Sequence, residues 1–107
     1  MASTSEGLVK RKTTNILVLL KTFYFFPTTG GYGRSGVTDI VGSYHGIFFG
    51  IECKANGNRP TALQQSQINA INATGGVAFV VDETTATYDY IYEQLESGRR
   101  RIQSGTG

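Results

Sequence analysis

Residues 36–54 read GVTDIVGSYHGIFFGIECK, and this stretch decides both the fold and the candidate site. Segment 42–46 predicts a hairpin turn, because it contains two glycines and separates the run that holds Asp39 from the β-forming run 47–51. Folding the chain about that turn brings Asp39 to within a residue or two of Glu52 across the ladder. The stretch therefore predicts a β-hairpin that brings two carboxylates together.

Lys54 belongs to the same patch. It follows Glu52 by two residues, so both side chains leave a strand on the same face. Two acids at this range repel each other unless a cation lies between them, and hard divalent cations prefer oxygen ligands. The residues therefore indicate a metal site. An ordinary hairpin with exposed acids is the alternative that these residues alone leave open.

Positive charge is concentrated in the larger, N-terminal part of the chain. Residues 1–81 carry seven basic and three acidic side chains, a net charge of +4, whereas residues 82–107 carry −2. Sparse carboxylates on a basic background suit a metal site that faces a polyanion. We expect DNA contacts from five basic residues, namely Lys10, Arg11, Lys12, Arg34 and Arg59. For the run at residues 10–12, the alternative interpretation is an ordinary solvated helix face.

Length and composition limit the class of protein. A chain of 107 residues predicts one domain, placed at residues 1–97, with a flexible basic tail at residues 98–107. One cysteine excludes an internal disulfide and a cysteine-rich zinc site, and one histidine argues against a histidine-based centre. No apolar run approaches the roughly 18 residues that span a membrane, and the polar start lacks the apolar core of a secretory signal. We therefore expect a soluble, intracellular protein.

Periodicity and turn residues predict seven elements. The apolar run 77–81 is typical of a strand buried on both faces. The order α-β-β-β-α-β-α predicts an α/β fold with a mixed sheet and helices on its faces. Helices are expected over residues 5–21, 61–74 and from 84 or 85 to 97, and strands over 23–26, on both sides of the hairpin within 37–54, and over 77–81.

Gln64 is a candidate for the same site. On the helix expected at 61–74 it shares a face with Ile68 and Ile71, and an amide on an apolar face is costly unless a polar group meets it. It also lies in the first turn, close in sequence to the strand that ends at Lys54. We therefore expect the side chain of Gln64 to face the site, and Gln65 and Gln67 are the alternative glutamines for this position.

Together these residues resemble the VRR-Nuc (virus-type replication-repair nuclease) family of the PD-(D/E)xK nuclease superfamily, nearly end to end. The family's Gly-x-Pro/Ser-Asp segment is similar to residues 36–39, with Thr38 where proline or serine is usual, and its Glu-x-Lys is similar to residues 52–54. Its first-helix glutamate is similar to Glu6, and its helical glutamine ahead of Gly-Gly and an apolar strand is similar to Gln64. The resemblance implies a restriction-endonuclease-like, three-layer α-β-α core.

The resemblance also implies metal-assisted phosphodiester hydrolysis with Mg²⁺, for which Mn²⁺ can substitute. Lys54 would orient the attacking water or stabilise charge on the phosphate, and Gln64 would orient Lys54 or the water. Glu6 would contribute directly or through water, although a role at the helix dipole is its alternative. The metal ligands implied are the side chains of Glu6, Asp39 and Glu52 and the backbone carbonyl of Cys53.

The activity implied is that of a structure-selective DNA endonuclease that resolves four-way (Holliday) junctions as a homodimer, in a bacterial host's cytoplasm if the chain is phage-encoded. Symmetric cutting of a branched substrate needs two active sites, and one such domain supplies one. Two alternatives remain: a nuclease for flap, linear or single-stranded DNA, and a non-catalytic DNA-binding module that keeps the fold. The set of Asp39, Glu52 and Lys54 argues against a non-catalytic module, because carboxylates close to phosphate do not help a protein that only binds DNA.

Overall fold

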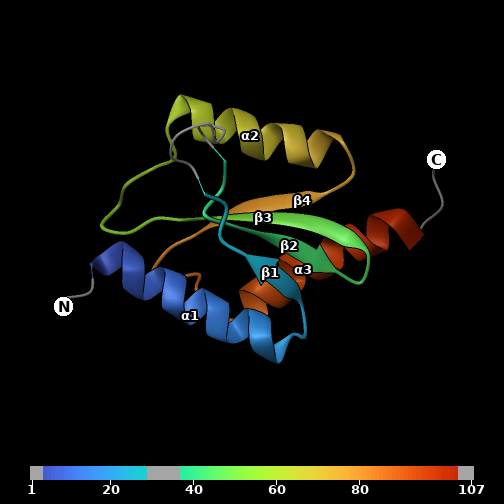
Figure 1. The fold of residues 1–107 in the computed structure, drawn as a ribbon, viewed down its shortest axis with the longest axis horizontal. Coiled ribbons are helices and arrows are strands. Elements are labelled where there is room, and N and C mark those ends of the chain that lie inside the picture. The colour runs from blue at the N-terminus through green and yellow to red at the C-terminus, as the bar shows by residue number, and fades with distance from the viewer. Residues whose placement is uncertain (1–3, 29–36, 104–107) are drawn as a thin grey trace.

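The structure, a computed structural model, describes residues 4–28 and 37–103. No helix within these two ranges is long and apolar enough to cross a membrane. Along the chain the elements are α1 (Ser5–Leu19), β1 (Phe23–Phe25), β2 (Ile40–Tyr44), β3 (Ile47–Cys53), α2 (Ala62–Ala73), β4 (Val77–Val81) and α3 (Tyr88–Gln103) (Figure 1).

The four strands form one sheet in the order β1-β2-β3-β4. Strand β2 is antiparallel to both β1 and β3, whereas β3 and β4 are parallel, because α2 crosses over between them. Helix α2 covers one face of the sheet, and α1 and α3 cover the other (Figure 1). The predicted α/β class with a mixed sheet is therefore confirmed.

The hairpin between β2 and β3 is tighter than predicted. Its turn consists of His45 and Gly46 alone, with the two positive φ angles, 50° and 84°, that a type I′ turn requires. Gly42, which was expected in the turn, pairs instead with Tyr24 of β1. A Cβ atom at Gly42 would lie 2.0 Å from the carbonyl oxygen of Phe23. Only glycine therefore allows β1 to approach β2 this closely.

Strand β3 forms the centre of the molecule. Its alternate residues Phe49, Ile51 and Cys53 are fully buried on the face that α1 and α3 cover, where they join the main hydrophobic core. The intervening residues Gly50 and Glu52 point to the opposite face, under α2. A carboxylate is thus placed inside the protein by the same alternation that builds the core.

Helix α1 begins and ends close to its predicted bounds, and strand β1 follows close to the place predicted for it. Thr4 caps the start of α1 by accepting a hydrogen bond of 2.9 Å from the N–H of Gly7. At the other end, the N–H groups of Lys21 and Thr22 donate to the carbonyls of Val18 and Leu17, which is a Schellman motif. Lys21 takes the left-handed position, φ 59°, so the helix ends at Leu19 and not at residue 21.

Helix α2 is anchored to the sheet at its C-terminal end. The side-chain amide of Asn72 accepts a hydrogen bond of 2.8 Å from the N–H of Ala78 and donates one of 3.0 Å to its carbonyl. Because β4 is an outer strand, these two bonds satisfy main-chain groups that no neighbouring strand meets. The helix therefore sits at a fixed position over β3 and β4.

Helix α3 begins later than predicted. The carboxylate of Asp82 accepts hydrogen bonds of 2.9 and 3.2 Å from the N–H groups of Thr84 and Thr85, so these residues form a turn. Thr87 then caps the helix, since its hydroxyl accepts from the N–H of Tyr90 at 3.3 Å. The prediction of a helix start at 84 or 85 is therefore wrong by a few residues.

The same helix also continues past its predicted end. Helix α3 does not end at Gly98. Instead, Gly98 lets the helix pack closely on the sheet, since a Cβ atom there would lie 3.3 Å from both Ile47 and Val77. Beyond it, Arg99 pairs with Glu96 at 3.2 Å, and the Arg101 guanidinium donates a 3.0 Å hydrogen bond to the carbonyl of Gly76. Residues 98–103 are therefore helical and not part of a flexible tail, while 104–107 lie outside the described residues.

Candidate active site

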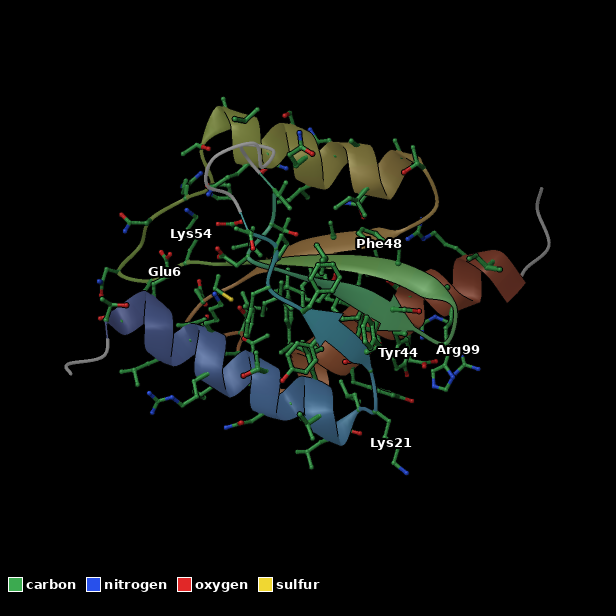
Figure 2. The ribbon with its side chains drawn as sticks, viewed as in Figure 1. Glu6, Lys21, Tyr44, Phe48, Lys54 and Arg99 are labelled. Carbon is green, nitrogen blue, oxygen red and sulfur yellow. The ribbon has the colours of Figure 1, made fainter. Side chains whose placement is uncertain are left out.

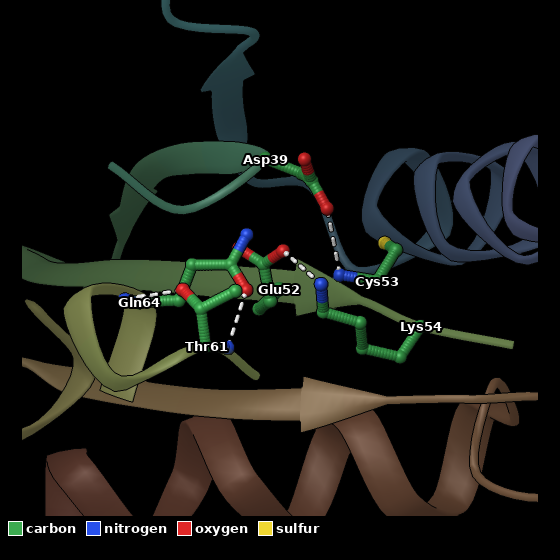
Figure 3. Close-up of polar contacts among 6 residues, drawn as sticks. All are labelled: Asp39, Glu52, Cys53, Lys54, Thr61 and Gln64. Carbon is green, nitrogen blue, oxygen red and sulfur yellow. Dashed lines mark hydrogen bonds and ion pairs between the residues drawn. The ribbon is translucent and has the colours of Figure 1, made fainter. Parts of the chain in front are cut away.

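Asp39 and Glu52 face each other at one end of the hairpin. Ile40 pairs with Ile51, so Asp39, which immediately precedes Ile40, lies opposite Glu52. The Asp39 carboxylate also accepts a hydrogen bond of 2.9 Å from the backbone N–H of Cys53 (Figure 3). This bond fixes Asp39 against the strand that carries Glu52, as the spacing in the sequence predicted.

Glu52 is a buried acid whose surroundings disfavour its charge. Its side chain is 1% exposed, and its Oε1 atom is buried without a hydrogen-bond partner among the described residues. The pKa of Glu52 is raised to about 7, first by burial and then by the charge of Asp39, although the ammonium of Lys54 opposes the shift. A buried, unpartnered carboxylate oxygen is costly, so this position favours a cation or a proton.

Lys54 lies on the same face as Glu52, as predicted. Its ammonium is 3.5 Å from Glu52 Oε2, and both side chains are largely shielded from solvent (Figure 3). One ammonium cannot balance two carboxylates, so the three groups together carry an excess negative charge when both acids are ionised. The site therefore suits an additional cation and places a donor beside it.

The backbone carbonyl of Cys53 is oriented toward the same region. In a strand, the N–H and C=O groups of one residue point to the same side, and the N–H of Cys53 points to Asp39. The carbonyl oxygen is thus a third candidate oxygen donor beside the two carboxylates. The Cys53 thiol points the other way, is fully buried, and has its pKa raised to about 12 chiefly by burial, so it is not a nucleophile.

Thr38 and Gly50 position Asp39, although the residue pattern alone does not single out Gly50. Thr38 is 1% exposed, and its hydroxyl donates a hydrogen bond of 3.1 Å to the carbonyl of Ile40. A Cβ atom at Gly50 would lie 2.7 Å from that hydroxyl and 2.9 Å from Ile71. The missing side chain at Gly50 therefore makes room for the residue that precedes Asp39.

Gln64 has a role that the predicted site did not include. Its side-chain oxygen accepts a hydrogen bond of 2.9 Å from the N–H of Thr61, and the Thr61 hydroxyl accepts from the N–H of Gln64 at 3.1 Å (Figure 3). This is a capping box at the start of α2. No described contact joins Gln64 to Glu52 or Lys54. The pattern Thr-x-x-Gln at 61–64 is the signal that would have revealed it.

The structure does not bring Glu6 to the two carboxylates as a third acid. Within residues 4–28 and 37–103, no three His, Cys, Asp or Glu side chains come close enough to hold a metal ion together. Glu6 is exposed in the first turn of α1, where its negative charge interacts favourably with the helix dipole. It does lie at the same end of the molecule as Lys54 (Figure 2). A contribution from Glu6 through water stays a prediction.

The basic residues proposed as DNA contacts differ in position. The Lys10 ammonium lies 4.3 Å from the ring centre of Phe26, a cation–π contact, and is partly buried. Arg11 and Lys12 are exposed on α1, and Arg59 is exposed in the loop that leads into α2. Arg34 lies outside the described residues.

A second polar cluster lies at the opposite end of the molecule and has a structural role. The Tyr44 hydroxyl donates to the carboxylate of Glu96, which also pairs with Arg99 (Figure 2). Burial raises the pKa of Tyr44 to about 12, while the hydrogen bond from Tyr44 lowers the pKa of Glu96. These contacts tie α3 to the hairpin. His45 in the turn is exposed, and its ring packs edge-to-face against that of Tyr44, with the ring centres 4.6 Å apart.

No protein-family model matches this chain, and a comparison with curated proteins also found no match. The function therefore has to be inferred from the geometry of the site itself.

Proposed function

We propose that this protein is a divalent-metal-dependent nuclease whose active site is formed by Asp39, Glu52 and Lys54. The observation that carries the proposal is the buried carboxylate of Glu52, which lies opposite a second carboxylate. Its Oε1 atom has no partner among the described residues, while its Oε2 atom is 3.5 Å from the ammonium of Lys54. A protein that only needed a stable hairpin would gain more from an apolar residue at this position. The cost of the buried acid is offset if a cation binds there.

The residues present fit a hard divalent cation. The donors are two carboxylates and the carbonyl of Cys53, all oxygen, which is the set that Mg²⁺ and Mn²⁺ prefer. Mg²⁺ usually keeps several waters and takes only one or two protein carboxylates, so two acids suffice. The bound ion would polarise the scissile phosphate and lower the pKa of a bound water toward neutrality.

Each residue then has a defined task. Asp39 and Glu52 hold the cation, and the hydrogen bond from Cys53 keeps Asp39 in place before the substrate arrives. Lys54 donates hydrogen bonds to the attacking water or to the phosphate oxygens as negative charge builds up on them. Burial of Lys54 and Glu52 strengthens these interactions, because water does not screen them. Gln64 supports the site indirectly, by fixing the start of α2 next to it.

The proposed substrate is DNA, and the proposed fold family is the restriction-endonuclease-like group that includes the VRR-Nuc nucleases. Exposed basic side chains on α1 and at Arg59 supply the phosphate contacts in this proposal. Within DNA, we propose a branched substrate such as a four-way junction, cut by two copies of the chain. Flap, linear and single-stranded DNA are the competing substrates.

The test uses end-labelled DNA of matched length as a four-way junction, a flap and a linear duplex. We expect cleavage in Mg²⁺ or Mn²⁺, none in EDTA, and faster cutting of the junction than of the duplex. Equal cutting of all three substrates would contradict the branched-DNA assignment but keep the nuclease. Binding without cutting in either metal would favour a non-catalytic DNA-binding module.

A further inference from the structure

Three phenylalanines project from the sheet face that also carries Asp39 and Glu52. Phe23 pairs with Ser43, which pairs with Phe48, so the two rings lie on one face, and Phe25 lies two residues along the same strand. Phe23, Phe25 and Phe48 are 69%, 51% and 50% exposed. The rings of Phe23 and Phe25 lie 6.3 Å apart and form one apolar projection. We call these three side chains the aromatic face.

The helices leave this part of the sheet uncovered. Helix α2 packs on β3 and β4, at the far side of the same face, while α1 and α3 lie under the opposite face (Figure 1). Strand β1 is an outer strand of the sheet and carries no charged residue. Outer strands of soluble proteins usually carry charges or cover that prevent association, so β1 has the character of a strand that is covered in the assembled protein.

A hollow lies beside the aromatic face. Its volume is about 340 Å³, and it runs between Val41 and Phe48 of the sheet and Ala70 and Ile71 of α2, with Thr74 just after the helix end. The hollow is on the same side of the sheet as the projecting rings, because Val41 pairs with Phe25 and Phe48 lies on this face (Figure 2). One face therefore offers both a projection and a space that can receive it.

We propose that the aromatic face docks against the same face of a second copy of this chain, with the rings of each β1 entering the hollow of its partner. A twofold interface requires one surface to be complementary to itself, and a projection beside a hollow meets that requirement. None of the residues that form the rings or line the hollow is charged. Two copies with a net charge of +2 each can thus meet here without placing like charges together.

The exposed area is of the right order for such a contact. A phenylalanine side chain buries about 200 Å², so three rings exposed by half or more present roughly 350 Å² on each copy. Two copies would bury about 700 Å² of aromatic surface, and the walls of the hollow supply most of the remainder up to the roughly 1,000 Å² of a stable interface.

The interface depends only on these exposed side chains and not on the cleavage proposed above. If both proposals hold, the carboxylate pair of each copy lies on the same sheet face as the interface, beyond its end. Two active sites would then be held at a fixed separation, which is what paired cuts in a branched DNA require.

The test is the mass of the protein in solution, measured without DNA or metal by sedimentation equilibrium from about 1 µM to about 200 µM, where an interface of this size becomes populated. We expect twice the 11.6 kDa of one chain. Phe23→Ser/Phe25→Ser removes the projection, and Ala70→Arg fills the hollow with a charge. Each should weaken association by about 100-fold or more, since buried aromatic anchors dominate interfaces.

Ile102→Ser is the matched control, because Ile102 is 59% exposed and lies on α3, under the opposite face. It should leave the mass unchanged. The proposal is overturned if the wild type keeps the mass of one chain at the highest concentration, or if Phe23→Ser/Phe25→Ser and Ala70→Arg stay dimeric. A monomeric wild type whose DNA binding weakens in Phe23→Ser/Phe25→Ser would show that nucleobases occupy the face instead.

Hydrogen exchange on the wild type gives an answer that does not depend on how the variants fold. Amides of β1 and β2 should exchange more slowly at high protein concentration than at low concentration, while amides of α3 should not change. Equal exchange at both concentrations would contradict a second copy on this face.

Discussion

The carboxylate of Asp39 accepts a 2.9 Å hydrogen bond from the backbone N–H of Cys53, the residue between Glu52 and Lys54. An acid at the start of one strand is thereby tied to the end of the neighbouring strand, beyond the last paired residues of the ladder. The bond holds two carboxylates close together although they repel each other. Asp39→Asn keeps an acceptor for this bond and removes the charge, so it separates the structural from the electrostatic role of Asp39.

The stability of the metal-free protein should fall as pH rises from 4.5 to 7. Glu52 has a pKa of about 7 in the folded chain and 4.5 as its ordinary value, so its contribution is fully present below pH 4.5 and is lost as pH rises through 7. The loss is up to about 3 kcal/mol in the free energy of unfolding. Urea unfolding in EDTA across this range measures it. Glu52→Gln is the control, and a wild-type-minus-variant difference that stays constant with pH would contradict the assignment.

Mg²⁺ should stabilise the protein at pH 8, where Glu52 is charged. A ligand that binds only the folded state at ten times its dissociation constant adds about 1.4 kcal/mol to the free energy of unfolding. The thermal midpoint of the wild type should therefore rise with Mg²⁺, and that of Asp39→Asn should rise far less. Equal increases in both proteins would place the effect of the ion elsewhere.

Gln64 should matter through the capping box and not through its amide nitrogen. Glutamate can also form the capping box, so Gln64→Glu should keep stability, whereas Gln64→Ala should lose about 1 kcal/mol. Thermal or urea unfolding measures both. If cleavage falls sharply in Gln64→Glu at unchanged stability, the amide nitrogen takes part in the chemistry and the purely structural role is wrong.

Gly42→Ala should destabilise the protein by about 2 kcal/mol or more, because the new Cβ would meet the Phe23 carbonyl oxygen at 2.0 Å and push β1 off the sheet. The neighbouring Ser43→Ala is the control and should change stability little, since Ser43 is half-buried and the substitution only removes its hydroxyl. Urea unfolding of the two variants decides the point. Similar values for both would show that β1 lies far enough from β2 to leave room for a Cβ atom at residue 42.

The sequence predicted the parts that follow from local pattern. Alternation placed Glu52 and Lys54 on one face, the glycine-rich segment predicted the hairpin, and the apolar run predicted β4 with its observed bounds. These features depend on neighbours in the chain, so residue types and spacing suffice to find them.

Both ends of α3 differ from the prediction, one through a distant contact and one through a local contact. The sequence pattern predicts that the helix ends before Gly98, yet Gly98 is the point where α3 crosses Ile47 and Val77. The pattern also predicts a helix start at Thr84 or Thr85, but the carboxylate of the nearby Asp82 holds their amides in a turn. Glycine and threonine are each compatible with both outcomes, and the contacts made in the folded chain decide between them.

We propose above that the carboxylates of Asp39 and Glu52, on neighbouring strands, hold a cation that drives phosphodiester hydrolysis. The most direct measurement compares single-turnover DNA cleavage in Mg²⁺ by Glu52→Gln with that by Glu93→Gln, an exposed acid on α3 that pairs with Arg100. Loss of one metal ligand should slow cleavage on the order of 1,000-fold, while Glu93→Gln should cut at the wild-type rate. Cleavage by Glu52→Gln at the wild-type rate would show that Glu52 does not hold a catalytic cation.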